Sequence, residues 1–382
     1  MTAPGTTVST TVRDTLTEAR YRWHNSTDPR IGRWHRRVDR LVCARPRVTV
    51  SYPADGGPTL AYAGLDDGLY HTLPFLEQRR GPTSHRESRR GAWAALDAPA
   101  ADILAVGHLA SQAVPAAGMA SIELPFRVNL VVRPGEDPAA IPSRLSRKAR
   151  QQYLREQGAR CRSLEVATSE ADFAYFYHHM HVPTMRRRHG AATRSVPVAT
   201  ARGSMFRRGV LFFLREHGDR VAGMLCRREP DTLVLRLAGV RDGAPDAYRS
   251  GTYLALYVSI LDWAVRGGVA AVDLSGSEPF LSKGIFQFKR KLHPEVRWPA
   301  THFAGKRLRL CVRRDTPAVR DFLVANPMLV AVEGGFEGLY FHDRIRPPRL
   351  DLRWRTGGVL DYRTADLDWF LGGVPCAASS AG

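Results

Sequence analysis

The chain has 382 residues, 44% of them hydrophobic and 24% charged, a composition typical of a globular protein with an ample core. Its five cysteines are scattered without a Cys-x-x-Cys pair, which argues against a disulfide framework and a zinc knuckle. The net charge of +19 attracts polyanions such as nucleic acid, phosphorylated cofactors or an anionic membrane surface, and so supports an anionic ligand.

The N-terminal segment gives no sign of regular structure. Residues 1–40 mix Thr, Arg, His and Trp without periodicity, so we expect an irregular N-terminal arm. Its first twenty residues lack the apolar core of a signal peptide. The best candidate for a transmembrane helix is interrupted by Asp262 and Arg266. These features predict a cytoplasmic protein.

Residues 41–142 carry short β-like segments separated by turns. Val48–Val50 predicts a strand, residues 53–58 a turn, and residues 122–132 one or two strands. Between them, residues 75–95 are rich in Arg and Gly and indicate a solvated loop. The pattern predicts a small β-containing region over residues 41–142.

From residue 143 onwards the elements follow one another closely. We expect a basic helix over residues 143–156, ended by Gly158, and then a strand over residues 164–168 and a long helix over residues 170–188. A hairpin over residues 209–226 and a further strand over residues 232–240 follow. Strand, helix, antiparallel strands, helix, strand is the order of an α+β protein rather than of repeated βαβ units.

The stretch from Tyr248 to Leu292 is the most informative. A small-residue turn, Arg249–Thr252, opens an amphipathic helix that Gly267 and Gly268 stop, and a buried strand with Asp273 near its end follows. Helix N-termini attract phosphate, and ligands gather at the carboxyl ends of strands in open sheets. The stretch therefore predicts an enzyme that holds an anionic donor.

This order of motifs resembles the GNAT acyltransferase fold, specifically its Fem-type branch of peptidyl and aminoacyl transferases. The matching segments are Leu145–Gly158, Phe173–Gly190, Val221–Gly223, Trp263–Leu274 and Phe288–Arg290. The chain departs from the family at Leu292, where Gly often stands, and it has no clean Arg-x-x-Gly-x-Gly/Ala pyrophosphate loop.

The resemblance implies a GNAT-like mixed sheet flanked by helices. It places a GNAT-like domain at residues 143–300 and a C-terminal extension at 301–382, and it allows residues 41–142 to be a diverged first half. The implied activity is transfer of an acyl or aminoacyl group from acyl-CoA or aminoacyl-tRNA to a small-molecule or peptide-like amine. A tRNA partner is implied in the second case. The alternative is a non-enzymatic, basic nucleic-acid-binding protein.

The candidate site residues fall into three groups. The catalytic candidates are Asp273 and Glu278; the donor-binding candidates are Arg249, Gly251, Lys283, Phe288 and Lys289; the substrate-binding candidates are Arg186, Arg187, His181, Tyr253 and Ser277. Backbone N–H groups around Val221–Leu225 are expected to polarise the acyl carbonyl.

Each candidate has a structural alternative. Asp273 suits a turn cap as well as a proton acceptor, and Glu278 suits a solvated loop. Arg186 and Arg187 complement a helix C-terminus, and the alternation through Phe288 and Lys289 also fits an edge strand. His178 and His181 have the i, i+3 spacing of metal ligands, but a packed helix is the favoured interpretation and no metal is expected.

Overall fold

The computed structural model describes residues 6–91, 101–114, 120–135, 140–189, 195–247 and 250–372. Its contacts divide the chain into two compact units, each assembled from separate segments. Unit 1 comprises residues 1–25, 130–275 and 291–294, and unit 2 comprises residues 26–129, 276–290 and 295–382. The domain boundaries expected at residues 143 and 301 therefore do not coincide with those of the two units, because the C-terminal segment shares a unit with residues 26–129.

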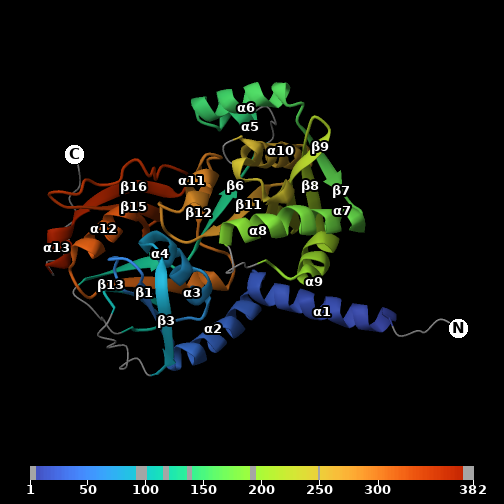
Figure 1. The fold of residues 1–382 in the computed structure, drawn as a ribbon. Coiled ribbons are helices and arrows are strands. Elements are labelled where there is room, and N and C mark those ends of the chain that lie inside the picture. The colour runs from blue at the N-terminus through green and yellow to red at the C-terminus, as the bar shows by residue number, and fades with distance from the viewer. Residues whose placement is uncertain are drawn as a thin grey trace. The chain divides into compact units, whose positions relative to one another are not determined.

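Unit 1 is built on one mixed sheet with strands in the order β6-β11-β10-β9-β8-β7 (Figure 1). The strands are β6 (Val128–Val132), β7 (Ser163–Ala167), β8 (Gly209–Glu216), β9 (Asp219–Arg228), β10 (Thr232–Val240) and β11 (Ala271–Ser277). Strands β7 to β10 are antiparallel, whereas β11 runs parallel to β10. The predicted α+β order is confirmed.

Helices cover both faces of this sheet. They are α1 (Thr6–Asn25), α5 (Ala140–Ser143), α6 (Arg147–Ala159), α7 (Glu170–Tyr175), the π-helix η2 (Phe176–His181), α8 (Val182–His189), α9 (Val198–Thr200), the π-helix η4 (Ala201–Met205), the short turns η5 (Phe206–Arg208), η6 (Arg241–Gly243) and η7 (Pro245–Ala247), and α10 (Thr252–Arg266). Phe212 meets Trp263 of α10, while its neighbour Phe213 meets Phe176 of η2. Because successive strand residues face opposite sides, α10 and η2 lie on opposite faces.

The helix expected over residues 170–188 is present but changes its winding in the middle. The segment α7-η2-α8 is continuous, and η2 supplies a π-helical turn where the helix crosses β10. A Cβ at Gly239 of β10 would lie 2.6 Å from the backbone nitrogen of His181. Glycine therefore allows the helix backbone to rest directly on the strand, and π-turns of this kind are frequent at functional sites.

Unit 2 contains a six-stranded sheet in the order β3-β1-β2-β4-β13-β5 and a three-stranded sheet in the order β14-β15-β16. The strands of these two sheets are β1 (Arg47–Pro53), β2 (Leu60–Gly64), β3 (Thr83–Arg90), β4 (Ile103–Leu109), β5 (Ala120–Pro125), β13 (Lys306–Val312), β14 (Met328–Val332), β15 (Gly335–His342) and β16 (Val359–Asp366). The short strand β12 (Glu295–Arg297), whose residues also fall in unit 2, belongs to neither of them. Strand β13, from the expected C-terminal extension, lies between β4 and β5 and is an integral part of the sheet.

The helices of unit 2 are α2 (Pro29–Ala44), α3 (Asp67–Tyr70), α4 (Thr72–Arg80), α11 (Gly284–Arg290), η8 (His302–Gly305), α12 (Pro317–Ala325) and α13 (Leu367–Leu371). Strands β2 and β4 are parallel neighbours, and α3 and α4 lie in the connection between them. Each unit thus holds a parallel strand pair whose connection carries helix, which is compatible with two GNAT-like halves. No helix in the described ranges is long and apolar enough to cross a membrane.

The irregular arm expected at residues 1–40 is instead helical, as α1 and α2. Asp28 caps α2 by accepting a hydrogen bond from the Arg30 amide at 2.7 Å, and Pro29 occupies the first turn. The buried face of α2 consists of His35, Asp39 and Cys43. Trp34, Val38 and Leu41 do recur at helical spacing, but they lie on the exposed face among many arginines, and this short period was not recognised in the sequence.

Two other local predictions were wrong. The solvated loop expected at residues 75–95 contains most of α4 and the whole of β3, an edge strand paired with β1 whose exposed charged residues imitate a loop. The edge strand weighed for Phe286–Lys289 is helix α11, in which Phe286 and Lys289, three residues apart, both point inward.

Candidate active site

The parallel strands β10 and β11 separate soon after they meet. They pair at three positions, from Thr232 with Ala271 to Val234 with Asp273, and β10 then bulges between Leu235 and Leu237. Beyond the last pair, the Ser275 hydroxyl donates to the carbonyl of Leu235. The remainder of β10 keeps its pairing with β9, so its other edge is available to groups outside the sheet.

Two side chains of the crossing helix occupy that open edge. The Val240 amide donates to Thr184 Oγ1 at 2.9 Å, and the same hydroxyl donates back to the Val240 carbonyl at 3.4 Å. Val240 therefore faces away from β9, and by the alternation of an antiparallel ladder Ala238 faces the same way. The Ala238 carbonyl accepts from His181 Nδ1 at 3.0 Å, so the half-buried Ala238 places its N–H on this edge as well.

The oxyanion donors expected at Val221–Leu225 are not available for that role. These residues belong to β9, which pairs with β8 on one side and with β10 on the other. A strand bonded on both edges has its amides committed to the ladder. The open edge belongs to β10, one strand further along the sheet.

His181 is held in a defined state beside this edge. Its Nδ1 faces a carbonyl, so Nδ1 carries the proton and Nε2 is left as an acceptor. The side chain is 2% exposed, and burial lowers its pKa, with the bond to the Ala238 carbonyl opposing the shift. Nε2 is buried and has no hydrogen-bond partner among the described residues. The result is a neutral imidazole with an unused basic nitrogen.

A cationic cavity of roughly 240 Å³ lies where β10 ends. Its lining comes from α8, from the turns after β10 and from the start of α10: Thr184, Arg187, Arg188, Val240, Gly243, Ala244, Pro245 and Tyr253. Gly243 has a φ of +67°, and a Cβ there would lie 2.8 Å from the carbonyl oxygen of Pro183. Two arginines and no carboxylate line the cavity, so it suits an anion.

Tyr253 and Arg188 form one wall of this cavity. The Arg188 guanidinium carbon lies 5.2 Å from the centre of the Tyr253 ring, a cation–π geometry. Burial raises the pKa of the Tyr253 phenol, and the neighbouring Arg188 opposes that rise. Arg187 is exposed and forms no ion pair with a described carboxylate. Arg186 is also exposed, but it does not line the cavity.

The turn that opens α10 is fixed by buried charges. Gly251 caps the helix with a φ of +72°, and the first turn of α10 contains no acidic residue. Arg162 donates to the Ser250 carbonyl at 3.2 Å, and the Thr252 hydroxyl donates to Glu216 at 3.3 Å. Glu216 is itself paired with Arg162, so the cluster neutralises its own charge. The predicted donor residue Arg249 lies outside the described residues.

Asp273 stands at the point where β10 and β11 part. It is half-buried, and its Oδ1 accepts from the Ser275 amide at 2.7 Å. Ser275 has a φ of +68°, a conformation that such a turn bond supports. The geometry gives Asp273 a structural task at the strand end, next to the open edge.

The remaining candidates belong to unit 2, where Glu278 is the centre of an ion cluster. Its carboxylate is 3% exposed and is paired with Lys283, while Arg127 and His71 each lie 3.6 Å away. The solvated-loop alternative is therefore wrong. Arg127 and His71 were not predicted, because they lie more than a hundred residues from Glu278 in the sequence and no local pattern connects them. Ser277 beside it is buried.

Phe288 and Lys289 lie on the short helix α11, where Lys289 is buried and Phe288 is half-buried. This burial indicates that both side chains contribute to the packing of the protein interior. On η2 of unit 1, His178 is exposed whereas His181 is buried, and His181 Nδ1 is engaged by the Ala238 carbonyl.

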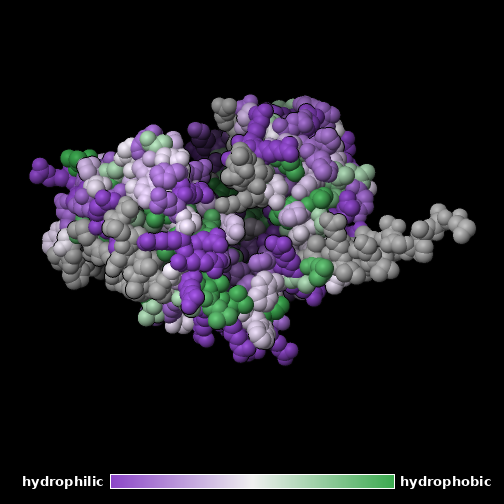
Figure 2. All heavy atoms as spheres, turned by 60° about the horizontal axis from the view of Figure 1, so that its bottom comes forward, coloured by the Kyte–Doolittle hydropathy of each residue, from purple (hydrophilic) through white to green (hydrophobic). Residues whose placement is uncertain are grey.

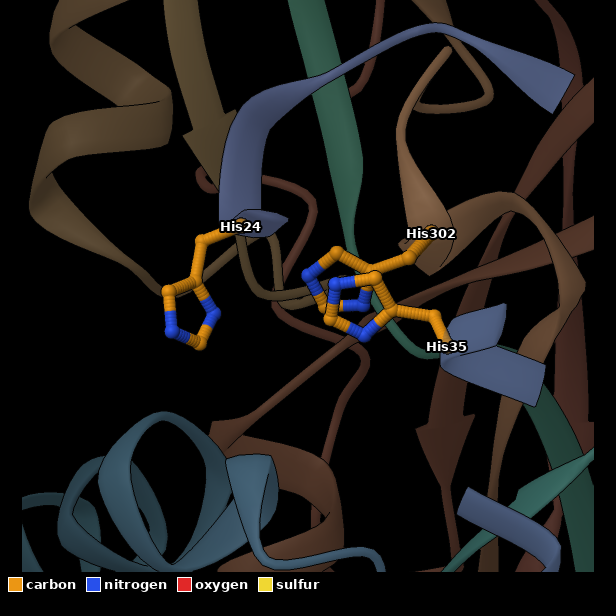
Figure 3. Close-up of side chains that lie close together, drawn as sticks. All are labelled: His24, His35 and His302. Carbon is orange, nitrogen blue, oxygen red and sulfur yellow. The ribbon is translucent and has the colours of Figure 1, made fainter. Parts of the chain in front are cut away.

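Unit 2 also contains a buried polar layer that the sequence did not indicate. The rings of His35 and His302 are stacked with centroids 4.1 Å apart (Figure 3). Lys306 is fully buried and pairs with Asp39 at 2.9 Å and Asp67 at 2.7 Å. A buried cation held between two carboxylates is a structural element with large energetic consequences.

No protein-family model and no curated protein sequence matches the chain. Similar solved structures include L-PGS from Bacillus licheniformis, at 12% identity and a TM-score of 0.34 over 78% of this chain and 96% of that one. FemX is 9% identical with a TM-score of 0.39, over 78% and 95% of the two chains. A GCN5-related N-acetyltransferase from Kribbella flavida is 13% identical with a TM-score of 0.25, over 80% and 64%. At these values, function must be inferred from the residues of this chain.

Proposed function

We propose that this chain is an acyltransferase that moves an acyl or aminoacyl group from an activated, anionic donor to an amine. The observation that carries the proposal is the open edge of β10, with the Ala238 amide and His181 on it, leading directly into the cavity of Arg187 and Arg188. In this proposal the donor phosphate binds in the cavity at the end of β10, and the reacting carbonyl lies along the open edge of the same strand.

The donor would bind through its phosphates in the cavity. Guanidinium groups recognise phosphate oxygens through charge-assisted, bidentate hydrogen bonds, and Arg187 and Arg188 are adjacent on α8. Both acyl-CoA and the acceptor end of an aminoacyl-tRNA present phosphates at a distance from the acyl carbonyl. The cavity would therefore recognise either donor through its phosphates, and the experiment below distinguishes acyl-CoA from aminoacyl-tRNA.

The reaction would be direct attack by the acceptor amine on the donor carbonyl. The amine nitrogen forms a bond to the carbonyl carbon, and the developing oxyanion accepts the Ala238 N–H. His181 Nε2 accepts the proton that the amine loses. The C–S or C–O bond to the donor then breaks, and the leaving thiolate or alkoxide takes a proton from the imidazolium.

Asp273 is the second candidate proton acceptor, and one substitution separates its two tasks. In Asp273→Asn the amide oxygen still accepts from the Ser275 amide, so the turn is kept while the negative charge is lost. Unchanged transfer activity in this variant assigns Asp273 to the turn; a large loss assigns it to proton transfer. Glu278 is not used as a base here, because Lys283 and Arg127 already face its carboxylate.

The donor is tested by thermal unfolding with acetyl-CoA, coenzyme A, charged tRNA and uncharged tRNA at low and high salt. A ligand specific for the folded state adds about 2.7 kcal/mol at a hundredfold excess over its Kd. We expect Arg187→Gln/Arg188→Gln to weaken the productive donor at least tenfold (about 1.4 kcal/mol). The control Arg147→Gln/Lys148→Gln removes two exposed cations from α6 and should not weaken it.

Three outcomes are informative. Stabilisation by acetyl-CoA that survives high salt identifies a coenzyme A donor, and a preference for charged over uncharged tRNA identifies an aminoacyl donor. Equal, salt-sensitive stabilisation by every polyanion, lost to the same extent in both double variants, contradicts the proposal and favours a nucleic-acid-binding protein that uses the basic surface without catalysis.

A further inference from the structure

Helix α2 of unit 2 shows three distinct faces around its axis. Its inward face, with His35, Asp39 and Cys43, packs against β4 and η8. At about 100° per residue, Trp34, Val38 and Leu41 fall within about 60° of arc on a second face. The third face holds five arginines: Arg30, Arg33, Arg36, Arg37 and Arg40.

The apolar face is open to solvent although hydrophobic side chains usually are not. Trp34 is 57% exposed, Val38 44% and Leu41 75%. In Figure 2, where the bottom of Figure 1 comes forward, hydrophobic side chains lie at the surface beside hydrophilic ones. Three large apolar groups aligned along one stripe of a helix form a contiguous patch, and such patches mark interaction sites.

The arginine face is also uncompensated. All five arginines are exposed, and none forms an ion pair with a carboxylate in the part of the chain that the structure describes. The one acidic side chain within the helix, Asp39, faces inward to Lys306. Arg37 lies over the Trp34 ring at 4.8 Å, so a cation and an aromatic ring share the boundary between the two faces.

We propose that α2 docks on an anionic membrane surface, with its apolar stripe in the headgroup region and its arginines on lipid phosphates. An apolar face with Trp and Leu beside an arginine-rich face is the pattern of helices that lie in the membrane interface. A partner protein could cover the apolar stripe, but five uncompensated arginines beside it match a surface of dense negative charge. Nucleic acid would supply the negative charge, but it has no apolar region into which the stripe of Trp34, Val38 and Leu41 could insert.

The binding strength should have two separable parts. Each arginine near an anionic leaflet contributes about fivefold in affinity, so the double variant Arg33→Gln/Arg37→Gln should bind about 25-fold more weakly. Trp34→Ser/Leu41→Ser removes the buried apolar contacts and should weaken binding by roughly tenfold or more at every salt concentration.

The test is co-sedimentation of the full chain with vesicles of phosphatidylcholine alone and of phosphatidylcholine mixed with phosphatidylglycerol. We expect binding to the mixed vesicles only, with both double variants impaired. The matched control is Leu360→Ser/Trp369→Ser, which removes two hydrophobic side chains that are 57% and 62% exposed elsewhere in unit 2. This control should bind as the unaltered chain does.

Several results would overturn the proposal. They are absence of binding to mixed vesicles, equal binding to neutral and anionic vesicles, and equal losses in Trp34→Ser/Leu41→Ser and in the control. A DNA duplex that binds as tightly as the mixed vesicles, with dependence on the arginines alone, would assign α2 to nucleic acid instead. Circular dichroism and the Tm of each variant check that the chain is still folded.

Discussion

Replacing Thr184 with valine tests whether one hydroxyl fastens α8 to the open edge of β10. Thr184 is 3% exposed, and its Oγ1 accepts from the Val240 amide at 2.9 Å and donates to the Val240 carbonyl at 3.4 Å. Valine has nearly the same shape as threonine, but its side chain can neither accept nor donate a hydrogen bond. It leaves a buried N–H without a partner, at a cost of about 1–3 kcal/mol, while the longer bond to the carbonyl contributes less.

We therefore expect Thr184→Val to lower the free energy of unfolding by about 2 kcal/mol and the Tm by about 4–8 °C. Urea unfolding and calorimetry measure both values. The matched control is Thr72→Val, because Thr72 is fully buried and its hydroxyl has no hydrogen-bond partner among the described residues. That substitution should be neutral or stabilising. If the two variants lose the same stability, the hydroxyl does not fasten the helix.

Three further outcomes are expected. Gly243→Ala should destabilise by more than Gly268→Ala as measured by urea unfolding, because both positions have positive φ but only at Gly243 would a Cβ lie 2.8 Å from a backbone oxygen; equal losses would contradict the close packing. Lys306→Met should cost about 3–5 kcal/mol by the same assay, since it leaves the buried Asp39 and the partly buried Asp67 without their cation; a neutral effect would show that the layer is hydrated. Burial lowers the pKa of His181 in the folded state, so as pH falls below about 6.5 the unfolded chain takes up the proton first and stability declines. His181→Gln should flatten this decline in Tm, and an unchanged slope would exclude His181 as its source.

The sequence predicted the elements whose signals are local. The run from Thr252 to Asp273 was correct because an amphipathic helix, a Gly-Gly stop and an apolar strand each leave their own pattern. Strand β10 was predicted with its observed bounds for the same reason. These are the elements that position the open edge and the start of α10.

The elements that the sequence missed depend on distant partners. Helix α2 turns polar side chains inward because Asp39 finds Lys306, more than two hundred residues away. Glu278 was taken for a weak candidate because its partner Arg127 is equally invisible to local pattern. The importance of His181 likewise follows from its bond to the Ala238 carbonyl, which only the crossing of η2 over β10 creates.

Hydrogen exchange of backbone amides, measured with and without donor, tests most directly whether the donor lies along β10. The account predicts that acetyl-CoA or charged tRNA slows exchange at Ala238 and in the first turn of α10, whose initial amides have no partner within the helix. The same protection should be absent in Arg187→Gln/Arg188→Gln. Donor binding that leaves Ala238 and the first turn of α10 unprotected, while protecting another part of the chain, would contradict it.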